Sequence, residues 1–154
     1  MTATSPERFE QAYRLFNEIN IIAQLSSNEM ARVLPHGLTL SQFSVLNWFA
    51  RVDDEATPGR LAAAFQVTKG AMTNTLQKLQ QKGFIEVTGD PTSGRRKLVR
   101  MTGSGRRARN AAIAATYPIL EAFLAHFGDA ATSAMLPQLE AIRSYLDQKR
   151  EGEH

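Results

Sequence analysis

The sequence contains no cysteine, and this absence excludes several classes of protein. A chain of 154 residues without cysteine has no disulfide framework, no thiolate metal site and no thiol with which to sense peroxide. It also lacks a run of about 18 to 20 apolar residues, the length that a membrane-spanning helix needs. The first residues show no basic stretch followed by an apolar one, so we expect no secretion signal and predict a cytoplasmic protein.

Groups that catalyse reactions are also scarce. The three histidines, His36, His126 and His154, have no His, Asp or Glu partner at metal-ligand spacing. No glycine-rich phosphate loop follows a predicted strand, and no serine lies in a nucleophile elbow. We therefore predict that the protein is not an enzyme and uses neither a metal nor another cofactor.

What the sequence does contain is an unevenly distributed charge and enough apolar residues, 43%, to build the core of one domain over residues 1–154. Between Arg60 and Arg109 there are eleven basic residues against two acidic ones, so this segment has a net charge of +9 and leaves −6 for the remainder. Such a basic segment is typical of a polyanion-binding surface. A solvated charged face is the alternative.

Apolar periodicity and capping residues predict the first three helices. The first extends from Ser5 to about Val33. The second begins at a capping box formed by Thr39 and Gln42 and ends in the polar turn 53–55. Its two apolar stripes place it at the centre of the core; they consist of Leu40, Phe43, Leu46 and Phe49, and of Val45, Trp48 and Val52. The third is short, from Pro58 to Phe65, and is expected to point Leu61, Ala64 and Phe65 inward.

After a turn at 66–67, Thr68 caps a helix that reaches Lys82 and is closed by Gly83. Alternating residues then predict two short strands, 84–87 and 98–101, separated by a loop over 88–97 with an exposed basic tip. Thr102 caps a long helix to about Phe127, bent at Pro118. A last helix follows the break at 128–129, its first turn divided from the rest at Pro137; its apolar residues are Leu136, Leu139, Ile142 and Leu146.

A short helix, a tight turn, a capped helix and a two-stranded hairpin form a winged helix-turn-helix. We thus predict a mainly α fold with a small β-hairpin wing. The DNA-binding lobe would be 36–102, flanked by the helical segments 5–34 and 103–150.

The capped helix after Thr68 has two different faces. Met72, Leu76 and Leu79 lie on one side and are expected to pack on the short helix before it. The opposite face has no acidic residue, and amides, a lysine and threonines can contact bases or phosphates in a major groove. We predict DNA contacts from Thr68, Lys69, Gly70, Thr73, Asn74, Gln77 and Lys78 on this helix, and from Arg95, Arg96 and Lys97 on the wing. An ordinary solvated helix face and a solubilising turn are the alternatives.

The segment from Thr39 to about Thr102 resembles the core of the MarR family, the multiple antibiotic resistance regulators. The stretches that match, in order and spacing, are LTLSQF (38–43), TPGRLA (57–62), VTKGAMT (67–73), LQQKGFI (79–85), DPTSGR (90–95) and VRMT (99–102). The resemblance implies a homodimer in which the N-terminal and the last two helices of both chains interlock, so that 5–34 and 103–150 would form dimerisation helices. It also identifies Arg95 as the wing arginine. One position departs from the family: Ser93 replaces the usual aspartate two residues before this arginine. The alternatives are that Arg95 is held less rigidly, with Arg96 and Lys97 sharing its role, or that Asp90 holds it instead.

Many members of the family release DNA when a small aromatic or phenolic anion binds. By position, the candidates for contacting such an effector are Tyr13, Arg14, His36, Phe43 and Trp48, with core or capping roles as the alternative.

We predict a homodimeric transcriptional regulator, a repressor, that binds pseudo-palindromic double-stranded DNA with half-sites about one helical turn apart. A winged helix that only binds another protein is the alternative. A steep fall of affinity with salt distinguishes DNA binding from it.

Overall fold

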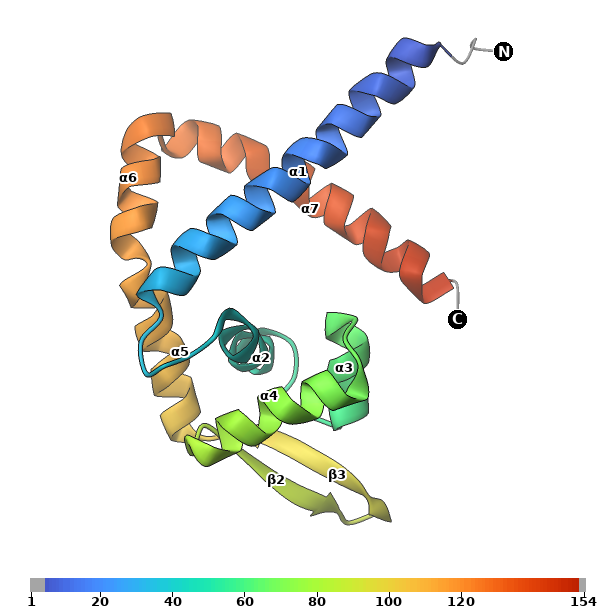
Figure 1. Ribbon diagram of the computed structural model, residues 1–154, viewed down its shortest axis with the longest axis vertical. Coiled ribbons are helices and arrows are strands. Elements are labelled where there is room, and N and C mark those ends of the chain that lie inside the picture. Colours follow the sequence, from blue (N-terminus) through green and yellow to red (C-terminus); the bar gives the residue numbers. More distant parts are fainter. Residues whose placement is uncertain (1–4, 153–154) are drawn as a thin grey trace. The chain divides into compact units, whose positions relative to one another are not determined.

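The computed structural model describes residues 5–152, apart from the side chains of Asp90 and Ser93. The chain separates into two compact units, one ending at Thr116 and one beginning at Tyr117. In order, the elements of the first unit are α1 (Pro6–Val33), α2 (Leu40–Arg51), β1 (Glu55–Ala56), α3 (Pro58–Phe65), α4 (Lys69–Gln81), β2 (Ile85–Asp90), β3 (Ser93–Met101) and α5 (Gly103–Ala115). The second unit consists of α6 (Tyr117–Phe127) and α7 (Asp129–Gly152). A mainly helical chain with one small antiparallel sheet confirms the predicted fold class (Figure 1).

Local capping chemistry determines where the helices begin. Thr39 and Gln42 form the predicted reciprocal capping box at the start of α2, with N···O distances of 3.3 and 3.2 Å. Thr57, Thr68 and Thr102 likewise accept a hydrogen bond from the amide three residues on, at the starts of α3, α4 and α5. Each hydroxyl satisfies an amide that has no partner within its helix. The predicted helix starts are therefore confirmed.

The core of the first unit gathers around α2, as its two apolar stripes predicted. Its buried apolar residues are Leu38, Phe43, Val45, Leu46, Phe49, Ala56, Leu61, Ala62, Met72, Leu76, Leu79, Ile85, Val99, Ala108 and Ala112. Two expectations were wrong in detail. Val52 is 57% exposed, because it follows the last turn of α2. In α3 the buried neighbour of Leu61 is Ala62, while Ala64 is only half-buried, since the packed face lies near the start of this short helix.

The sheet has the order β1-β3-β2 and is antiparallel throughout. The polar turn predicted at 53–55 overlooked β1, in which Glu55 and Ala56 pair with Arg100 and Val99. Two residues are too few for a recognisable alternation, and this strand exists because β3 offers backbone partners. Glu55 also accepts a hydrogen bond from the Arg100 guanidinium.

The predicted single bent helix from Thr102 to Phe127 is two helices. Proline lacks the amide hydrogen that a helix interior needs but is tolerated in a first turn, and Pro118 is accordingly the second residue of α6. The preceding turn closes at Thr116, whose amide and hydroxyl both donate to the Ile113 carbonyl, at 3.0 and 2.6 Å. Pro137, in contrast, does not divide α7, which continues through it.

In the segment that the structure describes, no single helix is long and apolar enough to cross a membrane. The helical segments on either side of Gly128 have the length and apolar composition of a membrane span only when the two are counted together.

Candidate nucleic-acid interface

Helix α4 presents the two faces that the sequence predicted. Met72, Leu76 and Leu79 are buried and α4 packs against α3, so these side chains fix its orientation. The turn between the two helices is held by Gln66 in a left-handed conformation, with φ of 53°. The outer face exposes Gly70, Thr73, Asn74, Gln77 and Lys78. The amide groups of Asn74 and Gln77 and the ammonium group of Lys78 are exposed and can contact a bound molecule.

The wing is longer than predicted, and its cations do not lie on a loop. Strand pairing continues from Ile85↔Met101 to Gly89↔Lys97, and the register then shifts so that Asp90 pairs with Ser93. Arg95, Arg96 and Lys97 therefore belong to β3, beside this irregularity, while the turn is at 91–92. The loop prediction relied on the glycines and proline of 88–97, whose low strand propensity the backbone ladder overrides. The proposed contact of Asp90 with Arg95, and the effect of Ser93 on it, lie outside the described side chains.

The wing, the start of α4 and the start of α3 border one groove of about 570 Å³. Its lining residues are Thr57, Pro58, Gly59, Lys69, Thr73, Arg95, Arg96 and Lys97. Five of these are among the ten predicted DNA contacts, and they come from α4 and β3, where Thr73 and Arg95 are twenty-two positions apart in the sequence. Among the described lining residues none is acidic, so the groove presents four positive charges and is suited to an anion.

Sequence reasoning missed the contribution of Thr57, Pro58 and Gly59 to this groove. The Thr-Pro pair did predict a helix start, and helix starts attract anions. What the sequence alone did not show is that β3 lies beside that start.

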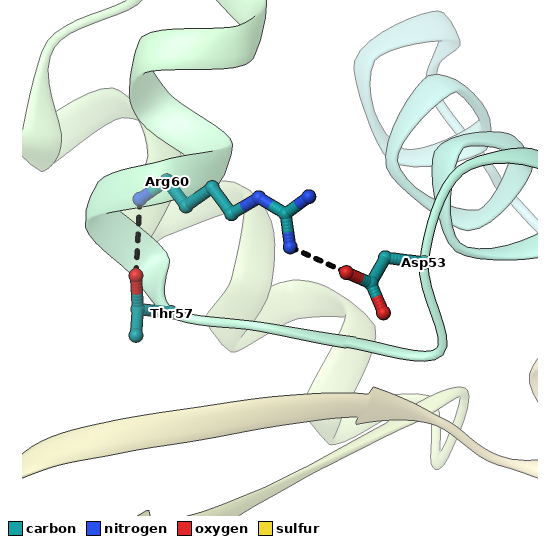
Figure 2. A network of polar contacts seen from close by, with 3 residues as sticks. All are labelled: Asp53, Thr57 and Arg60. Carbon is teal, nitrogen blue, oxygen red and sulfur yellow. Dashed lines mark hydrogen bonds and ion pairs between the residues drawn. The ribbon is translucent and has the colours of Figure 1, made fainter.

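Arg60, which follows the groove residue Gly59 in the sequence, is paired with an acidic side chain (Figure 2). Its guanidinium donates to the Asp53 carboxylate at 2.6 Å, while its amide donates to Thr57 at 3.1 Å. The hydrogen bond from Arg60 holds the pKa of the exposed Asp53 carboxyl below its ordinary value. The guanidinium carbon also lies 5.0 Å from the centre of the Trp48 ring, a cation–π distance. Arg60 thus joins α2 and α3 and is already neutralised.

The five residues predicted to contact an effector occupy different surroundings. Tyr13 and Arg14 are exposed on α1, and Phe43 is part of the core. Trp48 is covered by Arg60 and Phe49, and the His36 ring packs edge-on against Phe84 at 6.0 Å. None of the five lines the basic groove or a second hollow of about 280 Å³ between α2, α3 and α4.

Comparisons with known proteins agree with this architecture. The MarR family model matches residues 36–96. The transcriptional activatory protein BadR of Rhodopseudomonas palustris is 30% identical over 102 residues, which cover 64% of this chain and 58% of BadR. An HTH-type transcriptional regulator of Mycobacterium bovis is 30% identical over 100 residues, covering 64% of this chain and 69% of that protein.

Solved structures show the same fold. The transcriptional regulator BldR from Sulfolobus solfataricus superposes with a TM-score of 0.76 at 24% identity, covering 89% of this chain and 97% of BldR. A mutant of MarR from E. coli, complexed with operator DNA, superposes with a TM-score of 0.70 at 24% identity, covering 87% and 96%. The relatives are transcriptional regulators and not enzymes, which confirms the prediction of a non-enzyme. The chain belongs to the MarR family of transcriptional regulators.

Proposed function

We propose that the protein binds operator DNA as a homodimer, with α4 in a major groove and the basic groove on the adjacent sugar–phosphate backbone. The observation that supports this most directly is the groove itself, where Lys69, Arg95, Arg96 and Lys97 converge around one concavity. Phosphates spaced along a duplex are the anions that a row of cations beside a recognition helix fits best.

Base recognition is assigned to the exposed face of α4. Asn74 and Gln77 carry amides, which pair with adenine through one donor and one acceptor, and Lys78 can donate to guanine or phosphate. Gly70 has open space around it, so the start of α4 can approach the duplex closely. Thr68 caps this helix start, and we assign it to phosphate contact.

The charges at the helix starts support an anionic partner. Acidic residues stabilise a helix N-terminus and basic ones oppose its dipole. The first turns of α2 to α6 contain no acidic residue, among them those of α2, α3 and α4 in the lobe that we assign to DNA, whereas α1 and α7 have Glu7 and Asp129 there. The lobe that we assign to DNA therefore leaves its helix starts open to an external anion.

Homodimerisation is proposed because large apolar faces lack cover within their own unit. No residue of α1, α6 or α7 is buried, although all three belong to the described chain. Exposed side chains include Phe9, Tyr13, Phe16 and Ile22 on α1; Leu120, Phe123, Leu124 and Phe127 on α6; and Leu136, Leu139 and Leu146 on α7. Soluble chains rarely leave contiguous apolar faces to water. We propose that a second copy of the chain covers these apolar faces. Segments 5–34 and 103–150 are then the dimerisation segments, and 36–102 is the DNA-binding lobe.

A two-fold dimer places two α4 helices on successive turns of one duplex face, so the operator is a pseudo-palindrome with half-sites about 34–36 Å apart. Such a dimer represses when its operator overlaps a promoter. BadR is by name an activator. A reporter assay with the operator placed either upstream of a promoter or within it distinguishes activation from repression.

We also propose release of DNA by a small aromatic anion. Its contacts are assigned to Tyr13, Arg14, His36, Phe43 and Trp48, of which the first two are exposed on α1. A panel of aromatic acids, screened for a rise in melting temperature and for loss of DNA binding, tests this part separately.

Selection of duplexes from a random pool, followed by fluorescence anisotropy of the selected site against salt, tests the proposed function. We expect the logarithm of the binding constant to fall by about 0.9 per contacted phosphate for each tenfold rise in salt. Arg95→Ala should weaken binding to the selected and to random duplexes alike, because a phosphate contact has no sequence preference. Lys149→Ala, which removes an exposed cation from α7, is the matched control and should change nothing. A protein that selects no sequence and binds no duplex would instead be a protein-interaction module.

A further inference from the structure

Two arginines of the basic segment are not explained by α4 or by the wing. Arg106 and Arg107 are exposed where the first turn of α5 passes into the second. Arg107 donates to the Ser104 hydroxyl at 3.1 Å. Within the described chain neither forms an ion pair, whereas Arg60 and Arg100 are paired with Asp53 and Glu55. Their charges are therefore available to a partner.

The start of α5 is fastened to the far end of α4. The Thr102 amide donates to the Phe84 carbonyl at 3.0 Å, and its hydroxyl donates to the Gly83 carbonyl at 2.7 Å. Both acceptors follow α4 directly, and α5 begins where α4 ends in Figure 1. Gly105 permits this approach, because a Cβ there would lie 2.0 Å from the Phe84 carbonyl oxygen.

The two arginines thus lie at the end of α4 opposite to the basic groove, which contains Lys69 at the first residue of α4. Thirteen helical residues span about 20 Å at 1.5 Å per residue. The major groove is about 12 Å wide and is bordered by phosphates on both sides. A helix of this length, set into the groove, reaches from one row of phosphates towards the other.

The position is electrostatically unfavourable without a partner. The partial positive charge at the start of a helix repels nearby cations, and no acidic residue in the first turn of α5 offsets it. Gly105 and Ala108 form the buried stripe of the same turns, so the arginines do not serve the core. A bound anion would remove the repulsion from both side chains.

We propose that Arg106 and Arg107 form a second phosphate-binding site, on the strand across the major groove from the strand held by the basic groove. This inference rests on the proposed DNA-binding function. Each subunit then holds the duplex backbone at both ends of α4. The site adds affinity that is independent of sequence and fixes the angle at which α4 enters the groove.

The test compares the full-length protein with the double variant Arg106→Gln and Arg107→Gln, by anisotropy on the selected and on a random duplex over a range of salt. We expect the salt slope to fall by roughly 2 to 4 for a dimer that loses one or two phosphate contacts per subunit, at about 0.9 each. Both duplexes should bind on the order of tenfold or more weakly, with their affinity ratio unchanged.

Two further variants complete the test. The double variant Arg8→Gln and Lys149→Gln removes two exposed cations from α1 and α7 and should leave the slope unchanged. Arg106→Lys with Arg107→Lys should restore most of it, and melting curves should show that all three variants fold. An unchanged slope in the Arg106 and Arg107 variant, with normal binding by the wild type, overturns this inference alone. Absence of duplex binding by the wild type overturns the proposed function and this inference with it.

Discussion

The contact between α5 and the end of α4 provides a sharp stability prediction. Replacing Gly105 by alanine puts a Cβ 2.0 Å from the Phe84 carbonyl oxygen, 2.9 Å from its carbon and 3.0 Å from the Met101 Cγ. The first two atoms are backbone and cannot rotate away. Either α5 or the start of β2 must therefore move by more than about an ångström. This movement stretches or breaks the hydrogen bond from the Thr102 amide to the Phe84 carbonyl.

The cost follows from three effects. Overpacking of this kind costs about 1–3 kcal/mol, and weakening the partly buried hydrogen bond from Thr102 to Phe84 adds about 1 kcal/mol. Alanine is favoured over glycine within a helix by about 1 kcal/mol, which acts in the opposite direction. The free energy of unfolding should fall by about 1–3 kcal/mol, which lowers the melting temperature of a chain of this size by about 2–12 °C.

Urea and thermal unfolding, followed by circular dichroism, measure this change. Gly59→Ala is the matched control, because it also lies in a helix but has no atom within 4 Å of its added Cβ. The control should be as stable as the wild type, or more stable by up to about 1 kcal/mol. If Gly105→Ala behaves like Gly59→Ala, the close packing of α5 on Phe84 is refuted.

Three other predictions concern recognition, acid stability and assembly. Asn74→Ala or Gln77→Ala should reduce the preference for particular bases by about 1–3 kcal/mol, measured by repeating the selection; an equal loss on random DNA would remove these amides from base recognition. Because Arg60 lowers the pKa of Asp53, the ionised carboxylate stabilises the fold at any pH above the ordinary pKa of 3.8, and this stabilisation is lost as the pH falls through the lower pKa of the folded state. Urea unfolding at a series of pH values should show this loss of stability in the wild type but not in Asp53→Asn. If the free energy of unfolding of the two proteins changes with pH in the same way, the prediction is contradicted. Leu124→Asp should yield monomers at micromolar concentration in sedimentation experiments, and an intact dimer would exclude this part of α6 from the interface.

Features with a local cause were predictable from sequence. A threonine that caps the next turn needs no distant partner, so the starts at Thr39, Thr57, Thr68 and Thr102 were found correctly. Gly83 adopts the predicted left-handed conformation, with φ of 76°, because the end of α4 demands it locally.

Features that depend on a partner were not predictable. Strand β1 and residues 88–90 of β2 adopt strand structure because β3 pairs with them, and neither segment has an alternating pattern of its own. The chemistry of the site was predicted through residue types, as with Lys69 and Arg95. The contribution of Thr57–Gly59 required knowledge of how the wing folds back.

The stoichiometry and salt dependence of operator binding test the central claim most directly. A selected duplex of about 20 base pairs, two half-sites one helical turn apart, is titrated with the full-length protein, and the mass of the complex is measured by light scattering at several salt concentrations. Two chains per duplex, with affinity that falls steeply as salt rises and exceeds that for random DNA, is the predicted result. One chain per duplex, or affinity indifferent to both salt and sequence, would contradict a dimer that holds DNA through α4 and the basic groove.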